Sequence, residues 1–394
     1  GSLDANTSII DPNSGKPIEF VLIGQDSRDG EENQSVGGNF DDVVGNHQAD
    51  TTMVAQISAD RTKINLVSIP RDSLVDVPQC ETTNGTIPAQ YNVMFNSIFA
   101  NAYQTGGDLA SAASCTLNAV NSLTGLNIQN FIVVDFAGLV KMIDSVGGVD
   151  LCIPQNVNDP YTGLNLDKGM HHLDGVAATQ YARIRHGIGD GSDTSRTTRQ
   201  QYLIKQLMSE ALSKNLFTDT AQLYQLAKSA LKSLNISQGM ADTAALAGLA
   251  MSLKNFTMTN LQTQTVPVVP APSDPNRSVW TDEADNLWEK MRAGKPIFDT
   301  ADSNSGDSSD TSSDNSASSD DSGTTDSNQS DTTAETPDPV TGLITKSDGT
   351  LVDPSTGGTV DPDDGSIHDA TTGQYIGLAD RYLNATVCAV PAKN

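Results

Sequence analysis

The hydrophobic and polar positions along the chain predict short strands that alternate with helices. Apolar runs too short for helices predict strands at 18–23, 53–58, 63–69, 131–134, 149–153 and 263–269. Helix-like spacing and flanking turn residues predict helices at 91–103, 108–123, 136–145, 175–178, 195–214, 219–233, 241–253 and 282–291. This order indicates the α/β class, in which helices are layered on a sheet.

Composition divides the chain into four parts. Residues 1–16 form an N-terminal arm, whose first two residues are interpreted as a cloning scar, and residues 17–298 carry the alternating pattern. Residues 299–338 hold eleven acidic residues and no lysine, arginine or aromatic residue, which predicts a disordered linker. Residues 339–394 form a turn-rich C-terminal segment with Asp-Pro-x-Thr-Gly-like pieces. We favour a solvated segment over calcium binding for these acids.

The formal net charge of −26 argues against a function that depends on binding a polyanion. Residues 1–298 are acidic on their own, so the charge does not come only from the linker, and nucleic acid is not expected as a partner. No run of 18 apolar residues occurs, and no membrane span is therefore predicted within the chain. We expect a membrane anchor to have been trimmed from a position ahead of residue 1.

The four cysteines indicate an oxidising compartment outside the cytoplasm. None of them forms a Cys-x-x-Cys pair, so zinc and redox roles are weakly supported. An even number of widely spaced cysteines is typical of two disulfides in an extracytoplasmic protein. We favour Cys80–Cys115 and Cys152–Cys388, and the second bridge would tie the C-terminal segment to the body. The two other pairings, and four buried free thiols, stay open at this stage.

Polar residues lie next to the first three predicted strands, and they are the first candidates for chemistry. Asp26 and Arg28 follow the first strand, Asp50 precedes the second, and Arg71 follows the third. Ligands of α/β proteins usually bind at the ends of strands. Two carboxylates near arginines would place Mg²⁺ beside a polyphosphate, because Mg²⁺ takes few protein carboxylates and completes its shell with phosphate and water. Alternatively, Asp26 and Asp50 cap strands or pair with arginines.

The stretch 181–201 gathers four arginines in an acidic chain. The alternation at 181–185 predicts a short strand with Arg183 and Arg185 on one face. Asp193 or its two successors can cap the helix that follows. That helix places Arg196, Arg199 and Gln200 on one face, and Leu203 and Leu207 continue the stripe into apolar core.

Positive side chains at the start of a helix oppose the helix dipole, which favours anions there. The arrangement therefore indicates a bound anion, and phosphate or diphosphate suits arginine because the guanidinium binds it through two parallel hydrogen bonds. The alternative is that these arginines pair with the abundant acids. The adjacent pair His171 and His172 cannot easily share one metal, and we interpret both as structural.

Six blocks of the chain resemble the LytR-CpsA-Psr family, and together they cover roughly residues 17–298. The blocks lie at 24–28 (GQDSR), 49–54 (ADTTMV), 67–75 (VSIPRDSLV), 135–154, 159–186 and 195–201 (SRTTRQQ). The resemblance implies a central mixed β-sheet flanked by helices. It also implies a phosphotransferase, anchored at the outer face of the membrane of a Gram-positive cell, that moves a glycopolymer from a polyprenyl-pyrophosphate carrier to a peptidoglycan hydroxyl or a surface protein.

The resemblance also assigns roles to individual residues. Asp26 and Asp50 would hold Mg²⁺. The implied diphosphate ligands are Arg71, Arg183, Arg185, Arg196, Arg199 and Gln200, with Arg28 close by, and an apolar cavity between sheet and helices would take the lipid. Gln48 departs from the pattern, since many members have arginine there, and His47 could replace it in part. The base that activates the acceptor is not evident, and Asp72 and Asp193 are weak candidates.

Two other functions remain consistent with the residues. The same site would act as a lipid pyrophosphatase if water took the place of the acceptor. A non-catalytic envelope binding or scaffold protein is favoured by the long acidic segment. A serine hydrolase is set aside because the chain contains no Gly-x-Ser-x-Gly elbow.

Overall fold

The structure is a computed structural model that describes residues 10–26, 47–184, 188, 193–214, 219–297 and 336–389. Its centre is a six-stranded sheet in the order β13-β8-β1-β2-β3-β14. The bounds of these strands are β1 (Ile18–Asp26), β2 (Gln48–Ile57), β3 (Ile64–Ile69), β8 (Asn130–Val134), β13 (Asn235–Ile236) and β14 (Leu261–Thr265). Because β1 pairs antiparallel with β2 and parallel with β8, the sheet is mixed, as expected.

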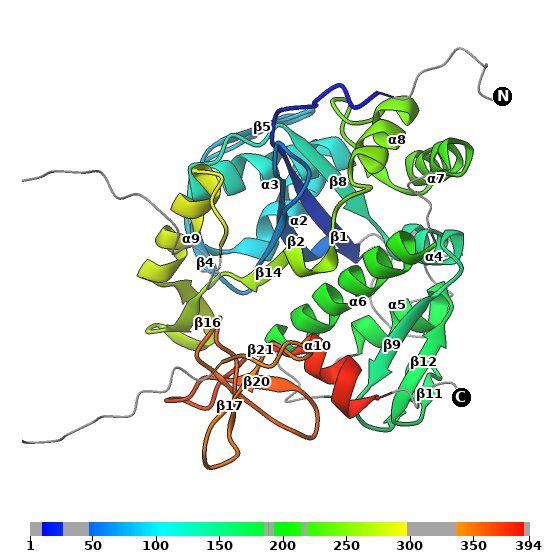
Figure 1. Cartoon of the computed structure of the whole chain (residues 1–394). Coiled ribbons are helices and arrows are strands. Elements are labelled where there is room, and N and C mark those ends of the chain that lie inside the picture. The colour runs from blue at the N-terminus through cyan, green and yellow to red at the C-terminus, as the bar shows by residue number, and fades with distance from the viewer. Residues whose placement is uncertain are drawn as a thin grey trace, which may run out of the picture.

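Helices cover both faces of the sheet (Figure 1). The bounds are α2 (Phe95–Gly106), α3 (Leu109–Thr124), α4 (Phe136–Ser145), α5 (Gly175–Arg183), α6 (Asp193–Ser213), α7 (Thr220–Ser233), α8 (Thr243–Ser252) and α9 (Asp282–Arg292). Five two-stranded antiparallel sheets complete this part of the chain: β4 (Leu74–Val77) with β7 (Gln90–Met94), β5 (Cys80–Thr82) with β6 (Gly85–Ile87), β9 (Val149–Ile153) with β12 (Gly169–Leu173), β10 (Val157–Asn158) with β11 (Asn165–Leu166), and β15 (Val268–Ala271) with β16 (Asp274–Trp280).

The period of two along each strand divides the side chains between the two faces. Val21 and Ile23 of β1 point into the core formed with α2, α3 and α9. Leu22 lies on the opposite face and packs in a cluster with Met53 of β2 and Ile204 of α6. The second face therefore belongs to α6, the helix that carries the predicted arginines.

Strand direction explains why the polar clusters of the sequence come together. The C-terminal end of β1 pairs with the N-terminal start of β2, with Gly24 opposite Thr51. The end of β3 lies at the same edge, since Ile69 pairs with Thr52. The parallel strand β8 ends there too, with Val134 beside Gly24. Four segments that are far apart in the chain thus deliver their flanking residues to one edge of the sheet.

Three sequence-based assignments were wrong. The strand expected at 263–269 is divided between β14 in the central sheet and β15 in a separate two-stranded sheet. The segment 181–185 was expected as a strand, but Tyr181–Arg183 form the last turn of α5. Asp174 caps that helix by accepting a hydrogen bond from the Ala177 amide, so the helix continues past the expected end at 178. The expected helix at 91–103 begins only at Phe95, because residues 90–94 pair with β4 as strand β7.

The C-terminal segment forms a small module around five short antiparallel strands, β17 (Ile344–Thr345), β18 (Leu351–Val352), β19 (Thr359–Val360), β20 (Ser366–His368) and β21 (Tyr375–Leu378). It ends with α10 (Asp380–Tyr382) and a π-helical turn (Leu383–Val387). Acidic side chains stabilise several of its turns from within. Asp338, for example, accepts hydrogen bonds from the Val340 and Thr341 amides. Most of the expected linker 299–338 lies outside the described residues.

The C-terminal module packs against α6, as Figure 1 shows for the orange and red segments. Tyr375 and Thr198 share a buried hydrogen bond of 2.8 Å between hydroxyls, and Lys205 pairs with Asp380 at 2.9 Å. The favoured disulfides are both present, with Sγ–Sγ distances of 1.96 Å for Cys80–Cys115 and 2.00 Å for Cys152–Cys388. The second disulfide joins the module to β9. Among the described residues, no helix is long and apolar enough to span a bilayer.

Candidate active site

A cavity of about 520 Å³ lies between the sheet and helices α4, α5 and α6. Its walls are largely apolar, and this lining comes from three strands, three helices and the residue after α7: Leu22, Met53, Val134, Phe136, Leu139, Met142, Ala182, Leu203, Ile204, Leu207 and Leu234. Leu203 and Leu207, which were expected to enter the core, therefore form part of a cavity wall. The polar residues of the lining include Gln25, Asp50, Thr51, Arg183, Arg196 and Gln200.

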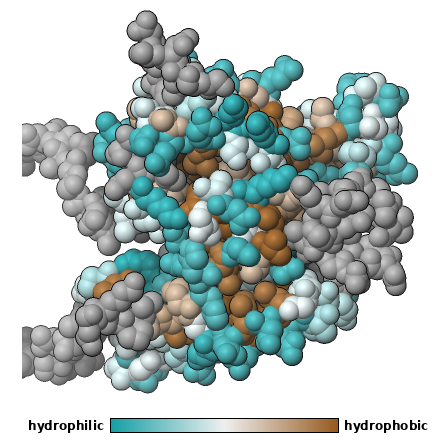
Figure 2. Space-filling model, turned by 90° about the vertical axis from the view of Figure 1, so that its right-hand side faces the viewer, coloured by the Kyte–Doolittle hydropathy of each residue, from teal (hydrophilic) through white to brown (hydrophobic). Residues whose placement is uncertain are grey.

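Figure 2 shows the side of the molecule on which α4 and α7 lie. Hydrophobic side chains gather there in a band across the middle of the face, between hydrophilic margins. Helix α4 supplies Leu139 and Met142 to the cavity, and Leu234 follows the last residue of α7. The apolar wall of the cavity is thus built from elements that lie on this hydrophobic side of the molecule.

The polar end of the cavity is organised around Asp50. Its Oδ1 lies 3.0 Å from Arg71 Nη1, and its Oδ2 lies 3.5 Å from Arg196 Nη1. Arg196 is almost completely buried, whereas Arg71 keeps about a quarter of its side chain exposed (26%). A carboxylate between two guanidinium groups offsets part of their charge, which lowers the cost of keeping them in a protein interior. The structure therefore brings three of the predicted site residues into contact.

Gln200 lies beside this ion-pair group, because it follows Arg196 by four residues on α6. The Thr51 hydroxyl donates a hydrogen bond to its Oε1. Gln25, on the neighbouring strand, contacts His47 at 2.6 Å between Nε2 and Nδ1, and the His47 ring stacks on Tyr103. His47, the expected partial substitute for an arginine at position 48, therefore reaches the cavity lining through Gln25.

Arg183 reaches the same cavity from the C-terminal end of α5. Its guanidinium carbon lies 3.4 Å from the centroid of the Phe136 ring, at the start of α4. A cation over an aromatic face is attracted by the ring quadrupole, and the attraction grows when water is excluded. Phe136 thus fixes where the Arg183 charge lies in the cavity wall.

Arg199 does not share the position of Arg196 and Gln200. Its Nη1 donates to Ser195 Oγ at 3.0 Å and its Nη2 donates to the Ile184 carbonyl. The residue is buried, and it lines a small pocket toward the C-terminal module rather than the large cavity. Positions i+3 and i+4 lie about 100° apart around a helix, so Arg199 and Gln200 point in different directions. This geometry gives Arg199 a role in holding the end of α5, and it does not support the expected contact with a diphosphate.

Four predicted site residues are described incompletely or not at all. Arg28 and Arg185 lie outside the described residues. Asp26 is the last residue of β1, in register with Gln48, and Asp193 is the first residue of α6, but nothing can be said of their side chains. The backbone therefore places Asp26 at the same sheet edge as Asp50, and the Asp26–Asp50 metal pair stays a prediction.

Asp72, the one of the two expected base candidates whose side chain the structure describes, does not lie where a base is needed. Asp72 accepts a hydrogen bond from the Ser278 hydroxyl and lies outside the lining of the large cavity. Tyr181 is no substitute, because burial raises its pKa to about 12 despite the opposing charge of Arg199. At neutral pH this phenol keeps its proton.

Sequence reasoning missed most of the cavity wall. Phe136, Thr51 and the apolar residues of α4 were not singled out, although the alternation of β1 and β2 already placed Leu22, Thr51 and Met53 on one face. A search for apolar positions on the sheet face that packs against an arginine-bearing helix would have found part of the lining. Leu234 could not have been found this way, because it belongs to the cavity only through the packing of α4 on α7.

Comparison with known proteins identifies the family. A profile of the LytR_cpsA_psr family matches residues 2–293. The chain belongs to the LytR-CpsA-Psr family. The expectation from the six sequence blocks is thereby confirmed, and so is the mixed sheet with flanking helices.

Two curated LytR-CpsA-Psr relatives illustrate the similarity. The cell wall biosynthesis protein LcpA of Corynebacterium glutamicum is 29% identical over 264 residues, which cover 64% of this chain and 50% of the relative. The polyisoprenyl-teichoic acid–peptidoglycan teichoic acid transferase TagU of Enterococcus faecalis is 26% identical over 208 residues, which cover 53% of this chain and 58% of the relative. The chain thus spans little more than half the length of these relatives.

A solved structure shows the same fold. The crystal structure of B. subtilis TagV superposes with a TM-score of 0.53 at 19% identity and covers 71% of this chain and 96% of that one. The family therefore includes proteins named as transferases of wall glycopolymers.

Proposed function

We propose that this chain transfers a glycopolymer from a polyprenyl-pyrophosphate carrier to a hydroxyl group of a cell-envelope acceptor. The observation that carries the proposal is a single cavity with two chemically different parts. One part is walled by leucine, isoleucine and methionine side chains, and the other holds Asp50, Arg183, Arg196 and Gln200. A polyprenyl pyrophosphate has the same division, an apolar chain joined to a dianionic or trianionic head. The family membership supports this assignment.

The apolar part suits an isoprenoid chain because burial of hydrocarbon stabilises the complex by roughly 25 cal/mol per Å² of apolar surface. The cavity is also of a size usual for small-molecule sites, which are clefts of about 300–1,000 Å³. The long chain of a polyprenyl lipid exceeds this volume. We therefore place only the isoprene units next to the diphosphate within the cavity.

The polar part suits a diphosphate because its arginines are already held in place. Asp50 pairs with Arg71 and Arg196 from two different elements, and Phe136 orients Arg183. A bound diphosphate would accept charge-assisted hydrogen bonds from these guanidinium groups. Stabilisation of phosphate charge and alignment of the reactants account for most of the catalysis in phosphoryl transfer.

Magnesium fits this part of the site chemically, because Asp50 offers the carboxylate oxygens that Mg²⁺ prefers. In this structure both oxygens face guanidinium groups, so Asp50 would share them between arginine and metal. Asp26, at the same sheet edge, would be the second carboxylate. When bound, Mg²⁺ would neutralise charge on the diphosphate.

The proposed reaction forms one P–O bond and breaks another, so each phosphorus atom of the diphosphate ends in a different product. The acceptor hydroxyl oxygen bonds to the phosphorus that carries the sugar, and the bridging P–O bond to the prenyl phosphate breaks. Prenyl phosphate leaves with the bonding electrons, and the hydroxyl proton passes to a base or to solvent. The product is a phosphodiester between acceptor and glycopolymer. Peptidoglycan and a surface protein are both suitable acceptors, outside the membrane where the two disulfides are stable.

The test is a transfer assay with a polyprenyl-pyrophosphate-linked glycan and a peptidoglycan acceptor. Arg196→Gln and Asp50→Asn should each reduce transfer at least about 100-fold, since the first removes a positive charge that would face the diphosphate and the second removes the carboxylate that holds Arg71 and Arg196 and would bind Mg²⁺. Arg277→Gln is the matched control, because Arg277 lies on β16 and does not line the cavity. Unchanged rates in both site variants would rule out the proposal.

The products separate this function from the two alternatives. A lipid pyrophosphatase would release the glycan phosphate into water at the same rate with and without acceptor. A binding or scaffold protein would show no turnover that depends on Mg²⁺. A glycan phosphodiester on the acceptor, formed only with Mg²⁺ and the intact arginines, is the result expected here.

A further inference from the structure

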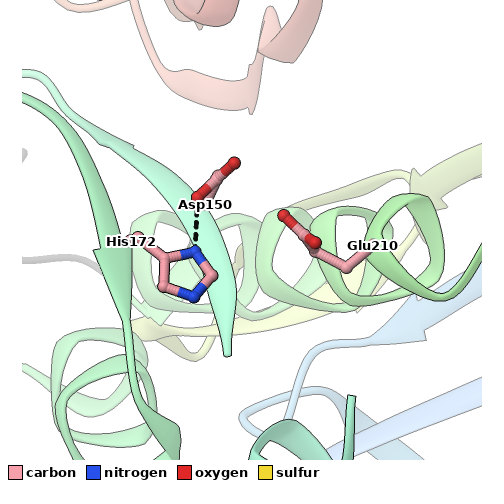
Figure 3. Close-up of side chains that lie close together, drawn as sticks. All are labelled: Asp150, His172 and Glu210. Atoms are coloured by element: carbon pink, nitrogen blue, oxygen red, sulfur yellow. Dashed lines mark hydrogen bonds and ion pairs between the residues drawn. The ribbon is translucent and has the colours of Figure 1, made fainter. Parts of the chain in front are cut away.

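Outside the large cavity, β9, β12 and α6 bring together Asp150, His172 and Glu210. One ligand atom of each side chain lies within 4.8 Å of the others. Figure 3 shows the imidazole and the two carboxylates facing a common space from the three elements. Within the part of the chain that the structure describes, this is the one group of three or more such ligands at metal-binding spacing.

The contacts of His172 define the state of its ring. Nε2 lies 2.7 Å from the carbonyl oxygen of Gly147, which can only accept a hydrogen bond, so Nε2 carries a proton. Nδ1 lies 2.7 Å from Oδ1 of Asp150, an ionised carboxylate that also only accepts. A neutral ring would therefore set a nitrogen lone pair against a carboxylate oxygen. The 2.7 Å separation is that of a hydrogen bond with a proton at Nδ1, and a metal ion bound to both atoms would hold them somewhat farther apart.

A backbone carbonyl on the second ring nitrogen is typical of metal-binding histidines. The carbonyl fixes the tautomer and the ring orientation, and it leaves the other nitrogen available as a ligand. The local backbone makes room for this contact. Gly148 has φ = +93°, and a Cβ there would lie 2.7 Å from His172 Nε2. Only glycine allows the chain to place the Gly147 carbonyl against the ring.

We propose that Asp150, His172 and Glu210 bind one divalent transition-metal ion, and that zinc suits the site best. One imidazole nitrogen and two carboxylates form a donor set that Zn²⁺ accepts, with water in the fourth position. The ion would link the paired strands β9 and β12 to α6. Since α6 also carries Arg196 and Gln200, the bound metal would restrict the helix that supplies residues to the large cavity.

The charges around the site favour a cation. The group holds two carboxylates, and one of them, Glu210, pairs with Lys214, whose Nζ lies 4.0 Å from Glu210 Oε2 and donates to the Val146 carbonyl. His171, the neighbouring residue, contacts the Asp167 carbonyl instead and takes no part.

The experiment is a titration of the full chain with Co²⁺, whose visible absorption reports tetrahedral coordination, followed by displacement with Zn²⁺. The wild-type protein and His171→Gln should bind one equivalent of Co²⁺ per chain and release it to Zn²⁺. His172→Gln and Glu210→Gln should lower the affinity at least tenfold. Circular dichroism establishes that each variant is folded. Absence of a Co²⁺ band in the wild type, or equal affinity in a folded Glu210→Gln variant, would refute the site.

Asp50→Asn distinguishes this site from the proposed diphosphate centre. The variant should keep the Co²⁺ band, because Asp50 lies in the large cavity and not among the three ligands. Loss of the band in Asp50→Asn with its retention in His172→Gln would overturn the inference. The titration needs no substrate, so its outcome is independent of whether the chain transfers a glycopolymer.

Discussion

At the scale of single residues, the candidate site depends on how its arginines are held. Asp50 pairs with Arg71 after β3 and with Arg196 on α6, and Phe136 covers Arg183 at the end of α5. Each contact prevents a long, flexible side chain from exploring many rotamers. Ordering of such side chains costs up to about 2 kcal/mol each, and here this cost is met before a ligand binds.

Phe136 offers a test of this preorganisation. Phe136→Leu keeps an apolar side chain in the wall but removes the ring beneath the Arg183 guanidinium. A buried cation–π contact contributes about 1–2 kcal/mol, so the transfer rate should fall about 5- to 30-fold in a turnover assay. Phe136→Tyr keeps the ring and should retain most of the rate. Equal rates in the two variants would show that Phe136 serves the cavity only as apolar surface.

At the scale of elements, α4 and α5 must lie unusually close for Phe136 to reach Arg183. Gly175, the first residue of α5, permits this approach, because a Cβ at that position would lie 2.3 Å from the Val140 carbonyl oxygen. Backbone atoms of a packed helix cannot yield as a flexible side chain can. The glycine is therefore required by the contact between two helices, not by its own backbone angles.

Gly175→Ala should push α4 and α5 apart. We expect a loss of about 1–3 kcal/mol in the free energy of unfolding, the usual cost of overpacking, measured by urea denaturation. The transfer rate of the folded variant should fall as well, because the Arg183–Phe136 contact opens. Gly85→Ala is the control, since its Cβ would meet only Thr105 at an ordinary 3.9 Å. A Gly175→Ala variant as stable as the control would contradict this account.

At the scale of the whole molecule, the C-terminal module and the α/β domain share α6. One face of the helix lines the cavity, and another contacts the module through Thr198, Tyr202 and Lys205. The Cys152–Cys388 disulfide closes the connection across 236 positions of the sequence. A link of this length restricts the unfolded chain strongly, by about 5 kcal/mol in the chain-entropy description.

Replacement of both cysteines, Cys152→Ser with Cys388→Ser, should therefore lower stability and release the module first. Calorimetry is expected to show an early transition of the module ahead of the main one. The control is the double variant Cys80→Ser with Cys115→Ser. The disulfide that it removes closes a loop of only 35 positions within one core, so its loss should lower the temperature of the main transition without dividing it. A single, unsplit transition in the Cys152–Cys388 variant would show that the module unfolds together with the domain regardless of the bridge.

The local pattern of the sequence determined much of this protein. Short apolar runs located β1 to β3, helical spacing located α3, α4 and α6 to α9, and the cysteine spacing favoured the disulfides that the structure contains. The polar residues beside the expected strands placed Asp50 and Arg71 at one edge of the sheet, where the two side chains form an ion pair. These features depend on residues near each other in the chain or on strand ends that any such sheet brings together.

Tertiary packing decided the rest. A five-residue alternation at 181–185 could not reveal that capping by Asp174 extends α5, and helical spacing alone could not direct Arg199 toward Ile184 rather than the cavity. The cavity wall and the group of Asp150, His172 and Glu210 each combine three or more elements, and the contact of Phe136 with Arg183 joins two helices. Such combinations depend on how helices cross the sheet, and this is set by the summed packing of many side chains and not by any local stretch.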